Sequence, residues 1–314
     1  MRAALIQRHG PPDVLEVGDL QPPAVSDRTV LVRVHATSVN PIDCYLRRGG
    51  LRRFAGVPLP IVPGVDLSGV VEACGRAVKG FRPGDEVFGY IPSGRGAAAE
   101  LAACEASWLA KKPPSLSHTE AAVLPCVGMT ALQGLRDKAR LRAGQRVLIV
   151  GASGGVGVMA VQIARAMGLE VTAVCSASNA QLVLNLGAAR VIDYTRQDPL
   201  QDSERFDAVF DAIGGQTFWA YRTLLTGGGT HVGISCTRRK VIDSLISRIT
   251  PGRKSFQFHV RASGQDLERL AAFVEQGTLK PIVSRVFPLA EMAAAHRQCE
   301  SRRTVGKIAV TVAP

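Results

Sequence analysis

A glycine-rich heptapeptide is the segment whose residue types and spacing point most directly to chemistry. The run Gly-Ala-Ser-Gly-Gly-Val-Gly, residues 151–157, follows the apolar stretch Val147 to Val150 and opens a helical pattern. A strand, a glycine turn and a helix in this order place the N–H groups of the helix start against a pyrophosphate. In the pattern A-x-G-x-x-G, Gly154 lets the backbone approach the pyrophosphate and Gly157 permits close helix-to-strand packing. We predict a dinucleotide site formed by Ser153, Gly154, Gly155, Val156 and Gly157, with a turn that binds no ligand as the alternative.

The end of the next strand selects between the two nicotinamide dinucleotides. An acidic side chain there would bond the ribose 2′-hydroxyl and repel a 2′-phosphate. After Cys175, where such a carboxylate would stand, the next one is Asp193. The polar residues Ser176, Ser178 and Asn179 can instead donate hydrogen bonds to phosphate oxygens. This favours NADPH, although no arginine lies in the stretch, and ordinary helix capping is the alternative interpretation.

The elements that must position this turn alternate between strand and helix. We expect strands at Arg146–Val150, Glu170–Cys175, Phe206–Ala212, Gly229–Ile234 and Ser255–Val260, and helices at Gly155–Met167 and Asn179–Leu186. Repeated β-α-β units imply a doubly wound parallel sheet covered on both faces. A helix precedes them, opened by the capping box of Ser117 and Glu120 and continuing toward Leu135.

The rest of the chain consists mainly of short β segments separated by Gly and Pro. We expect strands at Thr29–Val39, Ser68–Cys74 and Asp85–Tyr90, and near the end at Ile282–Phe287 and Lys307–Val312, with a helix at Asp266–Glu275. A chain of 314 residues is long for a single core. The fold class is therefore α/β, with a β unit at residues 1–118, completed by 264–314, and a Rossmann-type unit at 119–263.

Composition narrows the partners. The net charge is +12, but its Lys and Arg residues are scattered rather than gathered in a tail, so nucleic acid is not an expected partner. Seven widely spaced cysteines without a C-x-x-C predict neither a disulfide framework nor a four-cysteine zinc site. The glycine-broken run 147–164 is the longest apolar stretch, so we expect no membrane span and a cytoplasmic protein.

Further motifs, in their order along the chain, resemble one family. Ser-Val-Asn-Pro-Ile-Asp-Cys-Tyr (38–45), Pro-Gly-Val-Asp-Leu-Ser-Gly (63–69), Gly-Met-Thr-Ala (128–131) and Val-Ile-Asp-Tyr (191–194) are similar to landmarks of medium-chain dehydrogenases, specifically their quinone oxidoreductase branch. The resemblance covers essentially the whole chain. It implies a GroES-like β domain beside the Rossmann-type domain, and a homodimer in which the last strand of the sheet, Ser255–Val260, pairs across the interface.

The resemblance also indicates whether the chain has the ligands for a zinc ion. The zinc ligands of the related alcohol dehydrogenases fall on Asn40, Val65 and Cys126 here, and one candidate thiolate cannot replace the three protein ligands that a catalytic zinc requires. No counterpart of the structural-zinc cysteine cluster lies between Phe88 and Lys111. We therefore expect no metal, and hydride donation from NADPH to a quinone or another conjugated carbonyl.

By the same resemblance, Asn40 and Tyr45 line the acceptor site beside the nicotinamide, and either Tyr45 or solvent supplies a proton. Further cofactor contacts implied are Thr130, Tyr194, Gly233, Ile234 and Phe258. Two competing functions are a 2-enoyl-thioester or alkenal double-bond reductase and a non-catalytic NADPH-binding protein. The segment expected to shape the acceptor pocket, about Leu51 to Pro60, has no pattern that specifies the acceptor. His35 is interpreted as structural and His118 as facing solvent.

Overall fold

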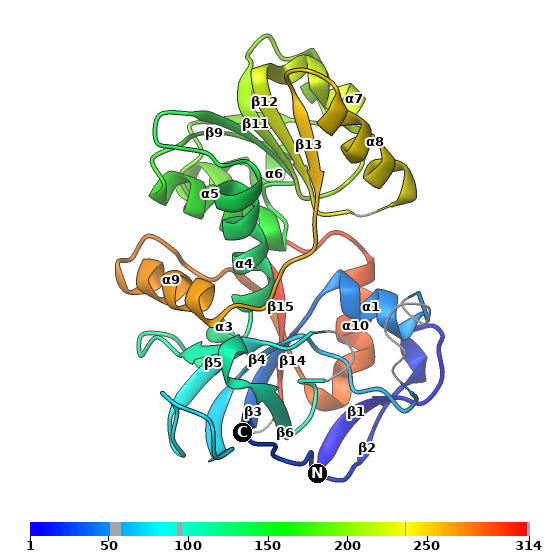
Figure 1. Cartoon of the computed structure of the whole chain (residues 1–314). Helices are drawn as coiled ribbons and strands as arrows, with labels where there is room; N and C mark the ends of the chain where they lie inside the picture. Colours follow the sequence, from blue (N-terminus) through cyan, green and yellow to red (C-terminus); the bar gives the residue numbers. More distant parts are fainter. Residues whose placement is uncertain (51–57, 93–95, 236, 313–314) are drawn as a thin grey trace. The chain divides into compact units, whose positions relative to one another are not determined.

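The computed structural model describes residues 1–314 except 51–57, 93–95, 236 and 313–314, and describes residue 248 by its backbone alone. Most of the segment expected to shape the acceptor pocket lies outside the described residues. The chain divides into two compact units (Figure 1). One comprises Met1–Met129, Ala262–Gln276 and Pro281–Pro314, and the other comprises Thr130–Arg261 and Gly277–Lys280. The limits at residues 118 and 264 stay sequence-based predictions.

The first unit is built on a sheet with the order β14-β15-β3-β4-β5-β7, in which β6 also pairs with β3. Its strands are β3 (Thr29–Val39), β4 (Asp66–Cys74), β5 (Glu86–Tyr90), β6 (Leu101–Glu105), β7 (Leu109–Lys111), β14 (Val283–Pro288) and β15 (Lys307–Thr311). A separate antiparallel pair is formed by β1 (Arg2–Ile6) and β2 (Leu15–Asp19). Its helices are α1 (Pro41–Arg47), α3 (His118–Ala121), α9 (Gly264–Glu275) and α10 (Met292–Glu300).

Strand β15 joins the last segment of the chain to the first. It pairs with β3 antiparallel, in a register that sets Ile308 opposite Val39, and with β14 parallel. Apolar side chains of β15 then pack with those of α1 and α10, among them Ile308, Cys44 and Met292. Residues from the two ends of the chain therefore share one core. This core is complete only when the last segment of the chain packs against the first.

The second unit is a six-stranded parallel sheet with the order β10-β9-β8-β11-β12-β13. Its strands are β8 (Arg146–Val150), β9 (Glu170–Cys175), β10 (Arg190–Asp193), β11 (Phe206–Asp211), β12 (Leu225–Gly233) and β13 (Lys254–Gln257). Its helices are α5 (Gly155–Ala166), α6 (Ala177–Asn185), α7 (Phe218–Tyr221) and α8 (Arg238–Ile249), while α4 (Pro125–Gln133) contains the boundary between the units. The order changes direction between β8 and β11, the switch point at which doubly wound sheets bind ligands.

The α/β fold class is confirmed, as is the alternation expected from the sequence. The strands expected at Thr29–Val39, Arg146–Val150 and Glu170–Cys175 have those limits. The continuous helix expected from Ser117 to Leu135 is wrong: α3 ends at Ala121, a turn follows, and Pro125 starts α4, which a π-helical turn at Gly134–Lys138 ends. A proline lacks the N–H that would continue the first helix, so it begins a new one.

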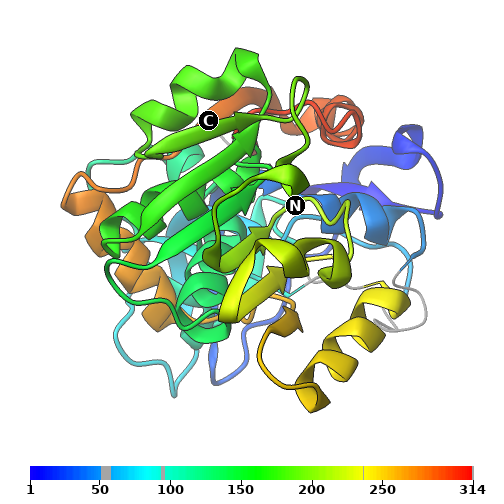
Figure 2. The ribbon, with the colours of Figure 1, turned by 90° about the horizontal axis from the view of Figure 1, so that it is seen from above.

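Two differences concern the end of the parallel sheet. Helix α8 was not expected from the sequence, and the last strand, expected at Ser255–Val260, is the shorter β13. Figure 2, which looks down on this unit, shows α8 at its periphery, beyond the strands of the sheet. Single-turn 3₁₀ helices occupy Pro12–Val14, Ala106–Trp108, Pro199–Gln201, Arg222–Leu224 and Leu289–Glu291. Among the described helices, none combines the length and the apolar character needed to span a bilayer.

Candidate functional site

The glycine turn lies where the sequence predicts it, between β8 and α5. Gly151 has a φ of 77°, a conformation that favours glycine, and its N–H donates to the carbonyl of Val174 on β9 at 3.1 Å. Gly154 is the N-cap of α5 and has no side chain with which to cap the helix. The first N–H groups of α5 are therefore oriented for an external anion at the carboxyl edge of the sheet.

Two glycines of the turn have different physical roles. A Cβ built on Gly157 would lie 2.1 Å from the carbonyl oxygen of Gly151 and 2.7 Å from the backbone of Ala152. A Cβ on Gly154 would meet nothing closer than the Gly151 carbonyl oxygen, at 3.4 Å. Gly157 is therefore required by the fold itself, while the space beside Gly154 is open to a ligand.

The polar residues after β9 gather beside this turn. The amide Nδ2 of Asn179 donates to the hydroxyl of Ser153 and to that of Ser176, both at 3.2 Å. The hydroxyls of Ser176 and Ser178 lie 2.9 Å apart. The structure thus brings four of the sequence-predicted cofactor residues into one cluster, which joins the turn after β8 to the end of β9.

Cys175, where the sequence places the discriminating position, is the last residue of β9. Its side chain is 2% exposed, and burial raises the pKa of its thiol. Strand β9 is buried on both faces and ends at Cys175, so the first residue of this junction open to solvent is Ser176, the half-buried N-cap of α6. A side chain at residue 176 is therefore open to a ligand, whereas one at residue 175 is not.

Asp193 and Arg196 also lie at this edge, where local sequence does not predict them. Asp193 pairs in register with Cys175, and its carboxylate accepts from the N–H of Thr195 at 3.0 Å. The guanidinium of Arg196 lies 3.6 Å from the Asp193 carboxylate and is largely exposed. Tyr194, between them, is 57% exposed. Local sequence places these residues far from Ser176, and only the β9–β10 pairing brings them to the same edge.

The remaining predicted cofactor residues, apart from Thr130, lie at the carboxyl ends of β12 and of the edge strand β13. Strand β12 ends at Gly233, whose carbonyl accepts from the N–H of Phe258 at 3.3 Å. The N–H of Ile234 donates to the carbonyl of Asp211 at 3.4 Å. These residues share the carboxyl edge of the sheet with the glycine turn. Thr130 instead belongs to α4, where its side chain is buried.

In the first unit, Asn40 is held at the centre of a buried polar cluster. It is the N-cap of α1, and its backbone N–H donates to the Asp43 carboxylate at 2.8 Å. Its amide Nδ2 donates to Asp66 at 2.7 Å and to the hydroxyl of Ser38 at 3.2 Å. Its amide oxygen accepts from the ammonium of Lys307 at 2.7 Å. All the polar atoms of this side chain therefore have protein partners.

Two carboxylates complete this cluster, which we call the Asn40 cluster: Ser38, Asn40, Asp43, Asp66 and Lys307. Asp66 also accepts from the backbone N–H of Cys126 at 2.7 Å, and Asp43 from that of Gly64 at 3.0 Å. Burial raises the pKa of Asp43 to about 6 and also raises the pKa of Asp66. The positive charge of Lys307 acts in the opposite direction and lowers the pKa of Asp66. Lys307 is thus the buried cation that opposes both negative charges.

Tyr45, the second residue predicted to line the acceptor site, differs from Asn40 in exposure. It lies within the short helix α1, and its side chain is 51% exposed. Its ring packs close to Gly50, where an added Cβ would lie 2.3 Å from a ring carbon. The phenol is therefore accessible to a ligand and to water, whereas Asn40, at the start of the same helix, is not.

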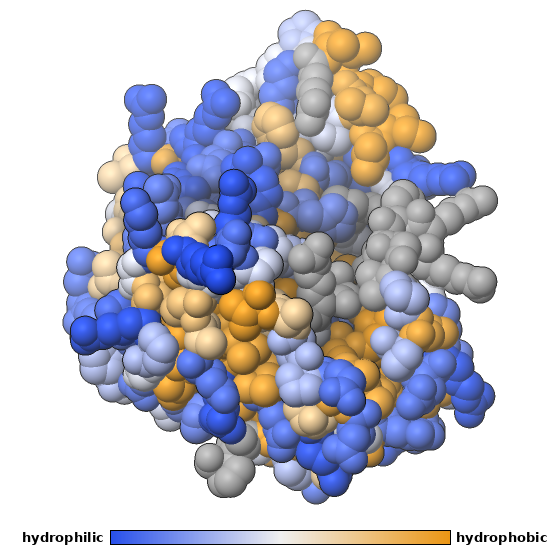
Figure 3. All heavy atoms as spheres, turned by 60° about the horizontal axis from the view of Figure 1, so that its bottom comes forward, coloured by the Kyte–Doolittle hydropathy of each residue, from blue (hydrophilic) through white to orange (hydrophobic). Residues whose placement is uncertain are grey.

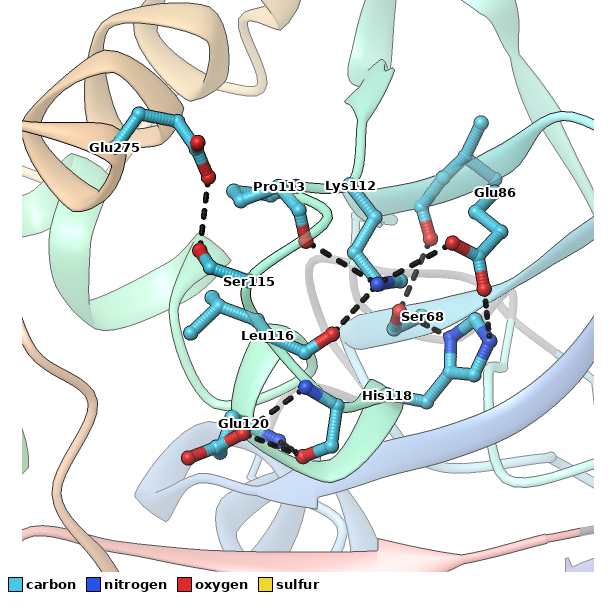
Figure 4. A network of polar contacts seen from close by, with 11 residues as sticks. Ser68, Glu86, Lys112, Pro113, Ser115, Leu116, His118, Glu120 and Glu275 are labelled. Atoms are coloured by element: carbon cyan, nitrogen blue, oxygen red, sulfur yellow. Dashed lines mark hydrogen bonds and ion pairs between the residues drawn. The ribbon is translucent and has the colours of Figure 1, made fainter.

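His118 does not face solvent as expected. Figure 4 shows its ring between Ser68 and Glu86, 2.8 Å from the Ser68 hydroxyl and 3.3 Å from the Glu86 carboxylate. The His118 ring also stacks on the ring of His35, with the two centroids 4.5 Å apart. Burial lowers the pKa of His118. Although a serine, a histidine and a carboxylate in line are typical of hydrolases, Ser68 is fully buried and bonds the carbonyl of Val87. This group is structural, as we inferred for His35 alone.

Comparison with known proteins identifies the family. Residues 26–114 match the alcohol dehydrogenase GroES-like domain and residues 186–310 the zinc-binding dehydrogenase model. The chain is 36% identical to the mitochondrial NAD(P)H oxidoreductase RTN4IP1 of Mus musculus, over 99% of this chain and 89% of that protein. The chain belongs to the medium-chain dehydrogenase/reductase superfamily, in its quinone oxidoreductase branch.

Two further proteins are similar to this chain over most of their length. The NADPH-dependent alkenal/one oxidoreductase of Arabidopsis thaliana chloroplasts is 33% identical over 100% of this chain and 80% of that protein. The structure of the quinone oxidoreductase from Coxiella burnetii superposes with a TM-score of 0.91 at 31% identity, covering 100% of this chain and 99% of that one. These matches span both units, so the family resemblance inferred from the motifs is confirmed.

The two glycine positions of the turn predict opposite outcomes. Gly154→Val should keep the melting temperature within about 3 °C, because the site is open, and should weaken NADPH binding at least about tenfold by blocking the approach of the pyrophosphate. Gly157→Ala should lower the free energy of unfolding by about 1–3 kcal/mol or more, because its Cβ overlaps the Gly151 carbonyl. Thermal unfolding and titration calorimetry measure both. Unchanged affinity in Gly154→Val would show that the turn is placed wrongly.

The Asn40 cluster predicts a pH-dependent loss of stability on removal of its cation. Lys307→Met should cost about 3–5 kcal/mol of unfolding free energy at pH 8, where the Asp43 carboxylate is ionised. The cost should shrink toward pH 5, because the raised pKa of Asp43, about 6, means that its carboxyl is then protonated and needs no cation. Urea unfolding at both pH values measures it, with the exposed Lys111→Met as control at under about 1 kcal/mol. A cost independent of pH would contradict the charge assignment.

Proposed function

We propose that the chain is an NADPH-dependent oxidoreductase that transfers hydride to a quinone or another conjugated carbonyl acceptor without zinc. The observation that carries this proposal is the Asn40 cluster. Asn40 stands where the related alcohol dehydrogenases have a zinc ligand, and the polar atoms of its amide all have protein partners. Relatives named as quinone and alkenal/one oxidoreductases support the acceptor class. Within that class, the membership of the chain in the quinone oxidoreductase branch favours a quinone over an alkenal or a 2-enoyl thioester.

Zinc does not fit the residues present. Of the three ligand positions, Val65 has no donor atom, and the Asn40 oxygen already accepts from the positively charged Lys307. Only Cys126 could offer a thiolate, and a catalytic zinc needs three protein ligands and an open position. A cation at this place would also lie against the Lys307 ammonium. No step of the reaction is therefore routed through a metal, even though one matching family model carries a zinc-binding name.

The second unit fits a phosphorylated dinucleotide. Uncapped N–H groups at the start of α5 suit the pyrophosphate, and the hydroxyls of Ser176 and Ser178 suit a 2′-phosphate. The exposed guanidinium of Arg196 adds a positive charge at the same edge. When bound, the reduced nicotinamide supplies the hydride, and the residues of the chain bind, orient and discriminate. Tyr194, Gly233, Ile234, Phe258 and Thr130 remain proposed contacts.

Tyr45 is the group we assign to the acceptor. A conjugated carbonyl accumulates negative charge on its oxygen as hydride arrives at the conjugated system, and a phenolic O–H can stabilise that charge. Because the side chain is half-exposed, water can return the proton to the phenol or to the product. Asn40 has no free donor and is a positioning residue, which begins the helix that carries Tyr45.

We also infer a homodimer in solution, the assembly implied by the family resemblance, and a cytoplasmic location remains an expectation from composition. The chain is 36% identical to a mitochondrial protein and 33% identical to a chloroplastic one, so location varies among its relatives. Composition therefore supports the cytoplasmic expectation, and family membership does not add to it.

A panel of acceptors tests the reaction class. NADPH oxidation is measured with a benzoquinone, an alkenal and a crotonyl thioester, each with and without a zinc chelator. We expect the quinone to give the highest kcat/KM and the chelator to leave every rate unchanged. Tyr45→Phe should lower the quinone kcat/KM about tenfold, the worth of one hydrogen bond to a charged oxygen. Tight NADPH binding without turnover on any acceptor would instead identify a non-catalytic protein.

The position of Ser176 predicts a change of cofactor preference. Ser176→Asp should lower kcat/KM for NADPH by at least about tenfold while leaving that for NADH unchanged or higher, because a carboxylate repels the 2′-phosphate and accepts from a 2′-hydroxyl. Ser176→Ala is the matched control, which removes one hydrogen bond without adding charge and should cost less than about fivefold. An NADPH/NADH ratio that is the same in all three proteins would refute the placement of the 2′-phosphate.

A further inference from the structure

Two cysteines from distant parts of the chain meet between α1 and α10 in the first unit. Cys44 belongs to α1 and Cys299 to α10, and Figure 1 shows these two helices side by side. Cys44 is buried in the core that the first and last segments share, and the half-buried Cys299 packs against the same core. The Cys44 thiol donates a hydrogen bond to the sulfur of Cys299. The two side chains are therefore in direct contact, and both are free thiols.

The contacts on either side of the two thiols hold the helices together. The Sγ of Cys44 lies 3.5 Å from Nδ1 of His296 and 3.9 Å from the carbonyl oxygen of the same residue. Cys299 follows His296 by one turn and lies on the same face of α10. One turn after Cys44, the guanidinium of Arg47 lies 3.3 Å from Nδ1 of His296 and also pairs with Glu300. The position of the thiol pair is thus set by polar contacts between the two helices.

His296 is a neutral acceptor for the Cys44 proton. Burial lowers the pKa of His296 to about 3, so its ring carries no charge near neutral pH. An arginine guanidinium only donates hydrogen bonds, so the Nδ1 atom that faces Arg47 has a lone pair. The thiol of Cys44 faces the same lone pair. Cys44 therefore has a base beside it that can take its proton when the sulfur reacts.

The two thiols differ in acidity and in exposure. The hydrogen bond from Cys44 lowers the pKa of Cys299, and the positive charge of Lys307 acts in the same direction. The same bond, together with burial, raises the pKa of Cys44. Cys299 is also the more exposed of the two. Because the thiolate is the reactive form of cysteine, Cys299 is suited to attack an oxidant and Cys44 to react afterwards as a thiol.

We propose that Cys44 and Cys299 form an oxidative modification site, at which a hydroperoxide closes a disulfide between α1 and α10. The sulfur of Cys299 attacks the hydroperoxide, so that an S–O bond forms, the O–O bond breaks and an alcohol, or water from hydrogen peroxide, leaves. The sulfur of Cys44 then attacks the resulting sulfenic acid, so that the S–S bond forms and water leaves. Two thiols are oxidised, and one hydroperoxide is reduced by the same two electrons. In a reducing compartment other thiols reverse the bond.

The disulfide acts on the helix that carries Tyr45. A disulfide bond is shorter than any contact between two thiols, so its formation draws α1 toward α10. Asn40 anchors the start of α1, and Tyr45 directly follows Cys44, so the movement falls on the part of the helix that holds the phenol. A small displacement of a positioned group is enough to slow a reaction. This consequence rests on the proposed function of Tyr45, whereas the disulfide itself does not.

Peptide mapping of the full-length protein tests the site. The protein is treated with a small molar excess of hydrogen peroxide, denatured, alkylated and digested without a reductant. Mass spectrometry should find a linked pair of peptides containing Cys44 and Cys299, which dithiothreitol separates. Cys74→Ser is the matched control, because Cys74 is half-buried on β4 with its Sγ 3.6 Å from the carbonyl oxygen of Phe81. This variant should form the same linked pair.

Single variants test the order of the two steps. Treatment of Cys44→Ser with hydrogen peroxide and dimedone should place dimedone on Cys299, because the sulfenic acid then has no second thiol to react with. In Cys299→Ser the remaining Cys44 should stay unmodified by dimedone. Dimedone on Cys44 in Cys299→Ser, with none on Cys299 in Cys44→Ser, would overturn the assignment of the attacking thiol.

Kinetics test the effect on the acceptor. Oxidation of the wild type should lower the quinone kcat/KM about threefold or more, with recovery in dithiothreitol, and should leave the affinity for NADPH unchanged. Cys299→Ser should keep its rate after the same treatment, which separates the disulfide from damage elsewhere. A mapped disulfide with an unchanged kcat/KM would refute the effect on Tyr45.

The peptide map decides the site whatever the kinetics show. If Cys44 and Cys299 are both alkylated after the treatment, or if either is linked to a different cysteine, the proposal is wrong. A reduced wild type without quinone activity would refute the proposed function instead, and a linked pair of Cys44 and Cys299 peptides would still confirm the disulfide.

Discussion

The buried ammonium of Lys307 is the interaction on which the first unit depends. It bonds the carbonyl of Val39 and the amide oxygen of Asn40, and it lies among two carboxylates whose charges it opposes. A buried cation and buried anions are each expensive alone, so the cluster forms as a whole or not at all. Because Lys307 belongs to β15, the return of the last strand is coupled to the position of α1. The same helix carries Tyr45, so the position of the residue that we assign to the acceptor depends on a charge from the other end of the chain.

The Asn40 cluster is also the reason for which we propose a reaction without a metal ion. A metal site needs unoccupied lone pairs, and here the amide and carboxylate oxygens are committed to N–H, O–H and ammonium donors. An acceptor without a Lewis acid must already be activated, as quinones and enones are by conjugation. The proposed substrate class thus rests on hydrogen bonds within the first unit, and the glycine turn of the second unit is the place that we propose for the cofactor.

Helix α8 has an unusual distribution of residues, with polar side chains buried and aliphatic side chains exposed. Figure 3 shows hydrophobic surface gathered at its upper right, over this helix. Its aliphatic spacing of four residues is helical, yet the side that packs on the protein is polar, because Ser244 and Ser247 satisfy the backbone of an edge strand. Open edges invite aggregation, and proteins cover them in several ways. Here a helix of the same chain does so while its aliphatic side chains, such as Leu245 and Ile249, stay exposed.

The sequence by itself determined the local elements and the order of the motifs. Strands such as Glu170–Cys175 and the turn at Gly154 follow from β-branched runs and glycine spacing, which act over a few residues. Only the tertiary structure decided that Cys175 is buried while Ser176 is open, that Asp193 reaches the same edge, and that Lys307 meets Asn40. Those facts depend on pairing between strands distant along the chain. Residue type and spacing do not encode such distances, because the partner of a buried charge or an edge strand is chosen by the whole fold.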